Sequence, residues 1–246
     1  MIKALVFDVF GTLVDWHSGV RQAGELAGRS VESERDWSQF ALDWRAGYGP
    51  AMAAVNDGRT SWRTIDDIHR AILDELLAGY GLETLTEADK QELNQVWHRL
   101  PAWPDVGEGQ ALLRRNHLLA PLSNGNVSLL IGLARTNGWH WDCVLSSELA
   151  GKYKPDPSVY RTAAKLLDLH SSEIMMVAAH DGDLRAAAAT GMATAWIHRP
   201  LEFGPVAPPP KFDEVSPTIA ADLVAPDLTT LSRQLADFGG QHIADD

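Results

Sequence analysis

The chain has 246 residues, a formal net charge of −12 and an isoelectric point near 5.1. This length suffices for one large domain, or for a core that carries a smaller inserted domain. The acidic composition, with no run of basic residues, excludes proteins that bind a phosphate backbone, because such binding depends on clusters of Lys and Arg. We therefore expect no nucleic-acid partner.

A single cysteine, Cys143, excludes an internal disulfide and favours a reducing compartment. The sequence enters its first predicted strand without a charged and then apolar leader, and no apolar run has the ~20 residues of a membrane span. These features predict a cytoplasmic protein with no membrane partner, in which Cys143 is a small buried hydrophobic residue.

The first predicted element is a buried apolar strand over residues 2–7, which is followed by Asp8 and broken at Gly11. In open α/β sheets, reactive groups lie at the carboxyl ends of parallel strands. Asp8 is therefore predicted to be held rigidly at a crevice, with the aromatic ring of Phe10 beside it. This segment resembles the first motif of the haloacid dehalogenase superfamily, whose phosphatase members carry a second Asp at the position of Phe10. The resemblance therefore implies that Asp8, with an aromatic neighbour and no partner acid, attacks carbon rather than phosphorus.

Residues 16–99 read as helices with few strand signals, and we predict a helical cap domain inserted into a core of residues 1–15 and 100–246. A capping box is expected at Thr86 to Asp89. Two predicted helical faces are apolar: Phe40, Ala41, Trp44 and Tyr48, and then Ile65, Ile68, Ile72 and Leu76. Five tryptophans lie in or beside this segment: Trp16, Trp37, Trp44, Trp62 and Trp97. Most are expected to form its core, and one or two to line an apolar pocket facing Asp8.

After Leu100 the pattern returns to alternating strands and helices, which predicts a Rossmann-like, doubly wound parallel sheet of α/β class. The predicted strands cover residues 118–122, 144–145, 174–179 and 193–197. The helices between them are expected after Asn126 and stopped at Gly138, after the cap Asp156, and over residues 183–190 with Asp181 as the cap. Residues 204–210 are predicted to form a proline-rich surface loop.

Four strand ends deliver polar groups to the core: Asp8 with Thr12, Ser123 with Asn124, Lys154, and His180 with Asp183. Their order and spacing resemble the four motifs of the haloacid dehalogenase superfamily over nearly the whole chain. The segments Leu122-Ser123-Asn124-Gly125-Asn126 and Tyr153-Lys154-Pro155-Asp156, the latter followed by Tyr160, most resemble the L-2-haloacid dehalogenases. The resemblance implies a hydrolase of short 2-haloacids.

In the implied mechanism, Asp8 attacks the α-carbon of the 2-haloacid and expels halide, and water then cleaves the resulting aspartyl ester. Lys154 and Thr12 are expected to keep Asp8 ionised by charge and hydrogen bonding. Lys152 competes with Lys154 for this role, but the spacing to Tyr160 and the following proline favour Lys154.

The resemblance also implies the residues that bind substrate. Ser123 and Asn124 are expected to hold the substrate carboxylate and receive the halide, and Arg45 is expected to reach both from the helical segment. Taken alone, Arg45 would read as an exposed partner of Asp43. The remaining expected substrate-binding residues are Val9, Phe10, Trp44 and Tyr160.

The fourth motif predicts a site without a metal cofactor. Magnesium-dependent members of the superfamily place an acid four or five residues before the position of Asp183, where this chain has Ala179 and Ala178. Asp183 is then expected to activate the hydrolytic water. His180 stands where typical family members have asparagine, and it is expected to position or deprotonate that water, or to contact halide.

Two other functions remain open at this point. A phosphatase of the same fold would need Mg²⁺ and a general acid, and a non-catalytic binding protein would keep the fold without the chemistry. The family also implies a homodimer, whose interface would be an exposed apolar helix face.

Overall fold

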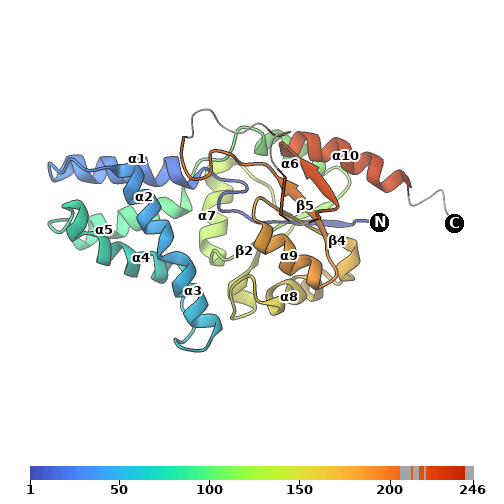
Figure 1. Cartoon of the computed structure of the whole chain (residues 1–246), viewed down its shortest axis with the longest axis horizontal. Coiled ribbons are helices and arrows are strands. Elements are labelled where there is room, and N and C mark those ends of the chain that lie inside the picture. Colours follow the sequence, from blue (N-terminus) through green and yellow to red (C-terminus); the bar gives the residue numbers. More distant parts are fainter. Residues whose placement is uncertain (206–211, 213–215, 219, 242–246) are drawn as a thin grey trace.

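A computed structural model describes residues 1–205, 212, 216–218 and 220–241. The predicted surface loop at 204–210 therefore lies mostly outside the described residues. The core is a parallel sheet of six strands in the order β3-β2-β1-β4-β5-β6 (Figure 1). The strands are β1 (Ala4–Phe7), β2 (Leu118–Ser123), β3 (Leu145–Ser146), β4 (Ile174–Ala178), β5 (Ala193–Ile197) and β6 (Leu223–Ala225). This order confirms the predicted α/β class.

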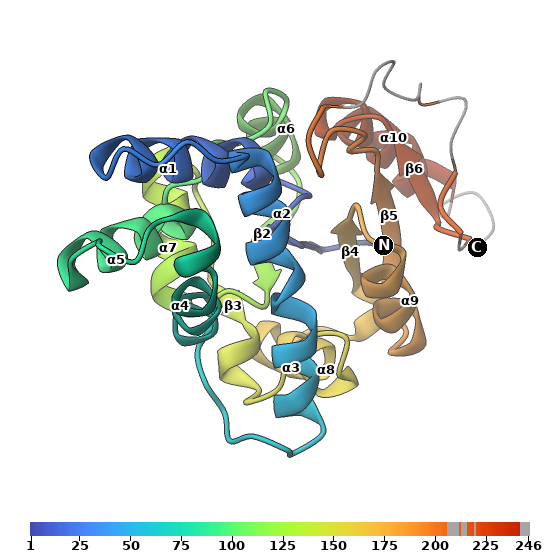
Figure 2. The ribbon, with the colours of Figure 1, turned by 60° about the vertical axis from the view of Figure 1, so that its left-hand side comes forward.

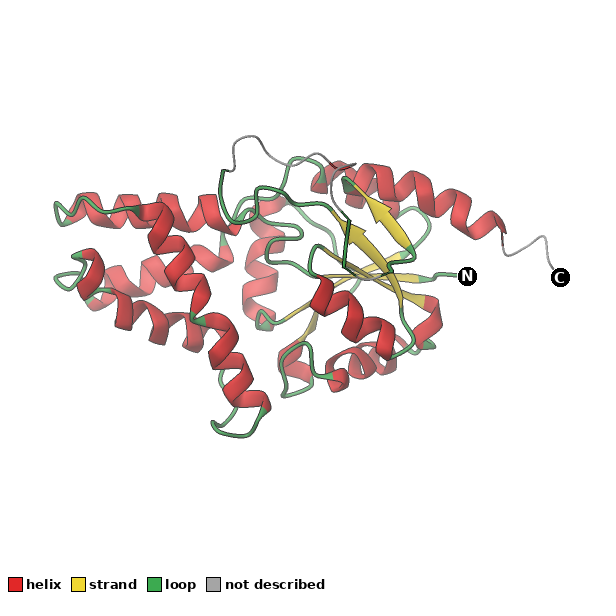
Figure 3. Cartoon of the chain, in the orientation of Figure 1, coloured by secondary structure: helices red, strands yellow, loops and turns green. Residues whose placement is uncertain are grey.

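Helices cover both faces of the sheet, as the alternation of apolar side chains along the strands requires (Figure 3). Leu5 and Phe7 of β1 face one cluster, and Ala4 and Val6 face the other. The first cluster includes side chains of α6 (Val106–Leu113), α7 (Val127–Asn137) and α10 (Leu228–Gln241). The second includes side chains of α8 (Pro157–Leu167) and α9 (Asp181–Ala189).

Between β1 and β2 the chain forms a separate layer of helices to one side of the sheet (Figure 2). We call this layer, from Trp16 to His98, the helical insert. Its α-helices are α1 (Trp16–Ser30), α2 (Trp37–Ala46), α3 (Tyr48–Asn56), α4 (Ile65–Leu76) and α5 (Glu87–Asn94), and its 3₁₀ turns are Ala78–Tyr80 and Gln95–His98. Trp44 and Trp97 are buried and pack edge to face, with ring centroids 5.4 Å apart. No helix in the described part of the chain is long and apolar enough to cross a bilayer.

Local sequence signals placed several helix ends correctly. The capping box at Thr86 and Asp89 is present, and Gly138 ends α7 with φ of 67°. The Asp156 side chain caps α8 by accepting a hydrogen bond from the backbone of Ser158. β6 and α10 were not predicted.

Two predictions were wrong in detail. Helix α9 begins at Asp181 rather than at Asp183, because His180 has the extended backbone of an N-cap and the Asp181 carboxylate accepts hydrogen bonds from Thr218 instead. Cys143 precedes β3 and is half-buried rather than buried.

The helical insert forms hydrogen bonds and a ring stack with the turn that carries Lys154. The Asn56 side chain, at the end of α3, donates to the backbone oxygen of Tyr153 and accepts from its backbone nitrogen, both at 2.8 Å. Lys152 Nζ donates to the Asn56 backbone oxygen at 2.7 Å, and the Trp62 and Tyr153 rings stack with centroids 4.6 Å apart. One amide side chain of the insert thus fixes the backbone next to Lys154.

This contact predicts the effect of Asn56→Ala. The substitution removes the hydrogen-bond partners of the backbone nitrogen and oxygen of Tyr153, which is buried. The free energy of unfolding should therefore fall by about 1–3 kcal/mol. Urea denaturation followed by circular dichroism measures the change. The control Asn116→Ala, in an exposed turn, should change it by less than about 0.5 kcal/mol. Equal stability of the two variants would contradict the structural role of Asn56.

Candidate functional site

The site lies where the strand order reverses, between the carboxyl ends of β1 and β4. Asp8 follows β1 and its backbone nitrogen donates to Val177 of β4 at 3.0 Å. Ligands of doubly wound folds bind at this switch point. Asp8 and His180 therefore leave two neighbouring strands at the same edge of the sheet.

Asp8 is buried and surrounded by hydrogen-bond donors. Its Oδ1 accepts from Lys154 Nζ at 3.0 Å, and its Oδ2 accepts from Thr12 Oγ1 at 2.8 Å and from His180 Nδ1 at 3.0 Å. Burial alone would raise the pKa of Asp8, but the charge of Lys154 and the hydrogen bond from His180 hold it well below its ordinary value. The carboxylate is consequently ionised at neutral pH.

Lys154 is buried between two carboxylates. Its Nζ lies 2.5 Å from Asp183 Oδ2, and Tyr160 donates to the other oxygen of Asp183 at 2.5 Å. Burial opposes the charge, but the charges of Asp183 and Asp8 raise the pKa of Lys154. Burial also raises the pKa of Asp183, with a further contribution from the charge of Asp8. The structure thus brings five predicted residues into one network with Asp8: Thr12, Lys154, Tyr160, His180 and Asp183.

Asn124 holds the backbone of Lys154. Its Oδ1 accepts from the Lys154 nitrogen at 2.7 Å and from Ser147 Oγ at 2.7 Å, and its Nδ2 donates to the Lys154 oxygen at 3.3 Å. Ser123 is fully buried, and its hydroxyl accepts from the backbone nitrogen of Gly125 at 3.2 Å. In this structure, both residues shape the turns around the site.

A cavity of about 320 Å³ opens onto Asp8. Arg45 and Tyr48 line it from the insert, and Phe10, Asn124 and Lys154 from the core. The guanidinium of Arg45 lies 4.3 Å from the centroid of the Tyr48 ring, and its buried Nε has no hydrogen-bond partner among the described residues. Burial raises the pKa of Tyr48 to about 12, so its phenol stays neutral. The volume is at the small end of ligand sites.

Phe10 joins the aromatic core of the insert to the site. Its ring contacts Tyr48, His69 and Trp97 edge to face, with centroids 5.8 to 6.4 Å apart. Trp44 lies behind this layer, and its indole nitrogen donates to the backbone oxygen of His69 at 2.8 Å. Val9 is buried next to Asp8. Of the three predicted apolar contacts, only Phe10 lines the cavity.

Sequence reasoning missed Glu202. It follows β5 in a short turn, is almost fully buried, and its carboxylate lies 2.8 and 3.0 Å from His180 Nε2. Gly11 makes this approach possible, since a Cβ there would lie 2.2 Å from Glu202 Oε1. The available signal was its position just after a buried strand, like the other polar groups of the site.

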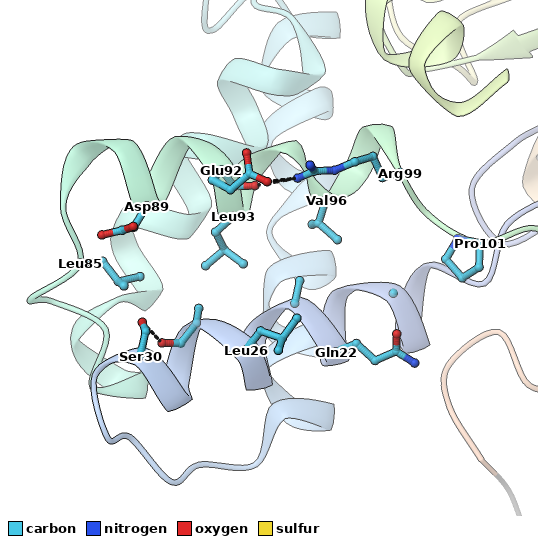
Figure 4. A pocket seen from close by; sticks show the side chains of 13 residues that line it. Gln22, Leu26, Ser30, Leu85, Asp89, Glu92, Leu93, Val96, Arg99 and Pro101 are labelled. Carbon is cyan, nitrogen blue, oxygen red and sulfur yellow. Dashed lines mark hydrogen bonds and ion pairs between the residues drawn. The ribbon is translucent and has the colours of Figure 1, made fainter. Parts of the chain in front are cut away.

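A larger cavity, of about 560 Å³, lies between α1 and α5 of the insert (Figure 4). Leu26, Leu93 and Val96 line it, and two of its charged residues, Glu92 and Arg99, pair with each other at 2.7 Å. We assign the site to the smaller cavity, because that one gathers the buried ionised groups. The described residues contain no cluster of three His, Cys, Asp or Glu side chains that could hold a metal.

Comparison with known proteins identifies the family. The model of the haloacid dehalogenase-like hydrolases matches residues 2–191. The chain is 33% identical over 202 residues to (S)-2-haloacid dehalogenase 1 of Pseudomonas sp. (strain CBS-3), covering 80% of this chain and 85% of the relative.

Two crystal structures share the whole architecture. The L-2-haloacid dehalogenase PA0810 is 42% identical with a TM-score of 0.87, and covers 96% of this chain and 100% of its own. The defluorinating L-2-haloacid dehalogenase Rha0230 is 41% identical with a TM-score of 0.90, over 96% and 95% of the two chains. This chain therefore belongs to the haloacid dehalogenase-like hydrolases and, within them, to the family of the L-2-haloacid dehalogenases.

Proposed function

We propose that the protein hydrolyses short L-2-haloacids to the inverted 2-hydroxyacid and halide, through an ester on Asp8 and without a metal. The observation that carries the proposal is the buried, ionised Asp8 with Lys154 at one oxygen and the aromatic Phe10 beside the site. A carboxylate of this kind is a nucleophile for carbon. The small cavity and the family of the chain support a short haloacid as the substrate.

In the first step, Asp8 attacks the α-carbon opposite the halogen, and the carbon–halogen bond breaks as the ester bond forms. Arg45 lines the insert side of the cavity and forms no ion pair within the part of the chain that the structure describes, so it is placed to bind the substrate carboxylate or the departing halide. The Tyr48 ring supports its guanidinium plane. Asn124 and Ser123 contribute by fixing the adjacent turns.

In the second step, water attacks the ester. Asp183 is our candidate for the group that accepts the water proton, since burial raises its pKa and it shares Lys154 with Asp8. Tyr160 orients its carboxylate. His180 acts in the same half-reaction, at the second oxygen of Asp8.

Metal independence is part of the proposal. Magnesium requires several carboxylate oxygens at one point. Here Phe10 stands where phosphatase members of the superfamily carry an acid, and Ala178 and Ala179 stand where its magnesium-dependent members place another. The ammonium of Lys154 already bridges Asp8 and Asp183. Lys154 thus supplies the positive charge that a metal ion would otherwise bring to the two carboxylates.

We also propose a domain division, a location and an oligomeric state. Residues 16–99 form the cap domain, which supplies Arg45 to a core of residues 1–15 and 100–246. The single cysteine favours a cytoplasmic location, and the family favours a homodimer.

Halide release tests the proposal directly. We expect wild-type protein to release halide from chloro-, bromo- or fluoroacetate or a 2-halopropionate equally with and without chelator. Asp8→Asn should lose at least about 10³-fold, while the control Asp168→Asn, at a helix end outside the site, should keep full activity. If the protein instead releases phosphate from phosphate esters, and a chelator abolishes that release, the result would support the phosphatase.

Arg45→Lys should raise KM for a 2-haloacid by about tenfold or more, because an ammonium cannot make the two parallel hydrogen bonds of a guanidinium. Steady-state halide release measures this. The control Arg29→Lys changes an exposed residue that pairs with Glu25 and should leave KM unchanged. An unchanged KM in Arg45→Lys would remove this residue from substrate binding.

The depressed pKa of Asp8 predicts the acid side of the pH profile. A carboxylate with a lowered pKa keeps its charge above that value, so the halide burst should be flat between about pH 5 and pH 8. In Lys154→Met, Asp8 and Asp183 lose the cation between them, which raises the pKa of Asp8. The halide burst of this variant should therefore fall with decreasing pH within this range. Lys165→Met, on an exposed position of α8, is the control. Identical profiles for the two variants would contradict the role of Lys154.

A further inference from the structure

Both ring nitrogens of His180 face carboxylates. Nδ1 lies 3.0 Å from Asp8 Oδ2, and Nε2 lies 2.8 Å from Glu202 Oε1. An ionised carboxylate only accepts hydrogen bonds, so both nitrogens must carry a hydrogen, which makes the ring an imidazolium. Burial opposes this charge, but hydrogen bonds to Asp8 and Glu202 outweigh it and raise the pKa of His180 to about 10.

Glu202 is itself held in place. Its Oε1 accepts from the indole nitrogen of Trp16 at 3.2 Å, and its backbone nitrogen donates to the Arg199 oxygen at 3.2 Å. Arg199 in turn pairs with Asp105 at 2.8 and 2.9 Å and donates to the Thr12 oxygen at 2.8 Å. The turn that carries Glu202 is therefore tied to the segment just after Asp8.

The two oxygens of Asp8 are not equivalent. Among the described residues, Oδ1 has one donor, Lys154, whereas Oδ2 has two, Thr12 and His180. Thr12 is oriented by the backbone nitrogen of Ala179, which donates to its hydroxyl at 2.9 Å. The oxygen with fewer donors keeps more lone-pair density for attack, so Oδ1 is the nucleophile and Oδ2 becomes the carbonyl oxygen of the ester.

We infer that Thr12 and the imidazolium of His180 form the oxyanion hole for hydrolysis of the Asp8 ester, and that Glu202 is the positioning residue that keeps His180 charged and aimed at Oδ2. This inference rests on the proposed function and assigns His180 the part of a donor rather than a base. Preorganised donors at a developing oxyanion lower the barrier most in a buried site such as this one.

Hydrolysis of the Asp8 ester begins with attack by water. The water oxygen bonds to Cγ of Asp8, its proton passes to Asp183, and the carbonyl electron pair moves onto Oδ2, where Thr12 and His180 donate to it. The Cγ–Oδ1 bond then breaks, and Oδ1 leaves as the hydroxyl of the 2-hydroxyacid after taking the proton from Asp183. The new carboxyl group of Asp8 releases its proton to solvent.

The ester changes the surroundings of His180. Asp8 has no charge in the ester, so of the two carboxylates in contact with the ring only Glu202 remains, and Lys154 lies beyond Asp8. The pKa of His180 is therefore lower in the ester than in the free enzyme. Because the charged ring is the active form, ester hydrolysis is lost as pH rises through this lower pKa.

Glu202→Gln in the full-length protein tests the inference at two levels. First, the His180 ring is titrated by nitrogen-15 NMR in the free enzyme, with its signal assigned by its loss in His180→Asn. The wild-type ring should stay protonated to about pH 9, and Glu202→Gln should lower its titration midpoint by more than about one unit. The control Glu173→Gln, which affects a pair with Lys3 remote from the site, should leave the midpoint unchanged.

Second, single-turnover reactions with a 2-halopropionate are quenched, and the ester is measured by intact-protein mass. Glu202→Gln and His180→Leu should keep the halide burst within about fivefold but slow ester hydrolysis by about 10²-fold, so that the ester accumulates. His180→Asn retains a donor at the position of Nδ1 without the charge, and should fall between wild type and His180→Leu. Trp16→Phe, which removes the indole hydrogen bond to Glu202, should show a smaller slowing of the same step.

Two results would overturn the inference. One is an unchanged His180 titration in Glu202→Gln, and the other is an equal loss of halide burst and ester hydrolysis in Glu202→Gln and His180→Leu. Failure of the proposed function has a different signature, since wild-type protein would then release no halide from any 2-haloacid.

Discussion

The structure of the site depends on one interaction, the buried ammonium of Lys154 between the carboxylates of Asp8 and Asp183. Two carboxylates this close would not both stay ionised without a cation, and one would take up a proton. Removing one member of a buried charge group commonly costs about 3–5 kcal/mol. With Lys154 present, Asp8 keeps its charge, and the same lysine links this proposed nucleophile to Asp183, which we propose accepts the proton of the hydrolytic water.

Lys154 needs support from two directions, because it comes from a turn rather than from a strand. Asn124, at the end of β2, binds both polar groups of its backbone, and Asn56 of the helical insert does the same for Tyr153. The insert thereby positions Lys154 through the backbone of Tyr153, and it also contributes Arg45 to the lining of the cavity. This explains why the layer of helices and the sheet cannot be treated as independent units in this chain.

Much of the site was predictable, for a local reason. Asp8, Ser123 and His180 lie at or just after the carboxyl ends of apolar strands. Parallel strands bring these ends to one edge of the sheet, independently of the loops and helices that connect them. Thr12 lies one turn from Asp8, so its contact is also local. Trp44 shows the limit of such reasoning, since helical periodicity places it on an inward face but does not say whether that face meets the cavity or the core of the insert.

The sequence by itself determined the α/β class, the carboxylate at the first strand end and the lack of acids at positions 10, 178 and 179, since these follow from short-range pattern and spacing. The tertiary structure alone decided that His180 lies between two carboxylates, because its second partner, Glu202, lies 22 residues away and approaches across the backbone of Gly11, where a Cβ would block it. It also decided that Asn56 and Asn124 hold the lysine turn. Contacts of this kind join residues whose separation in the chain carries no periodicity, and only packing brings them together.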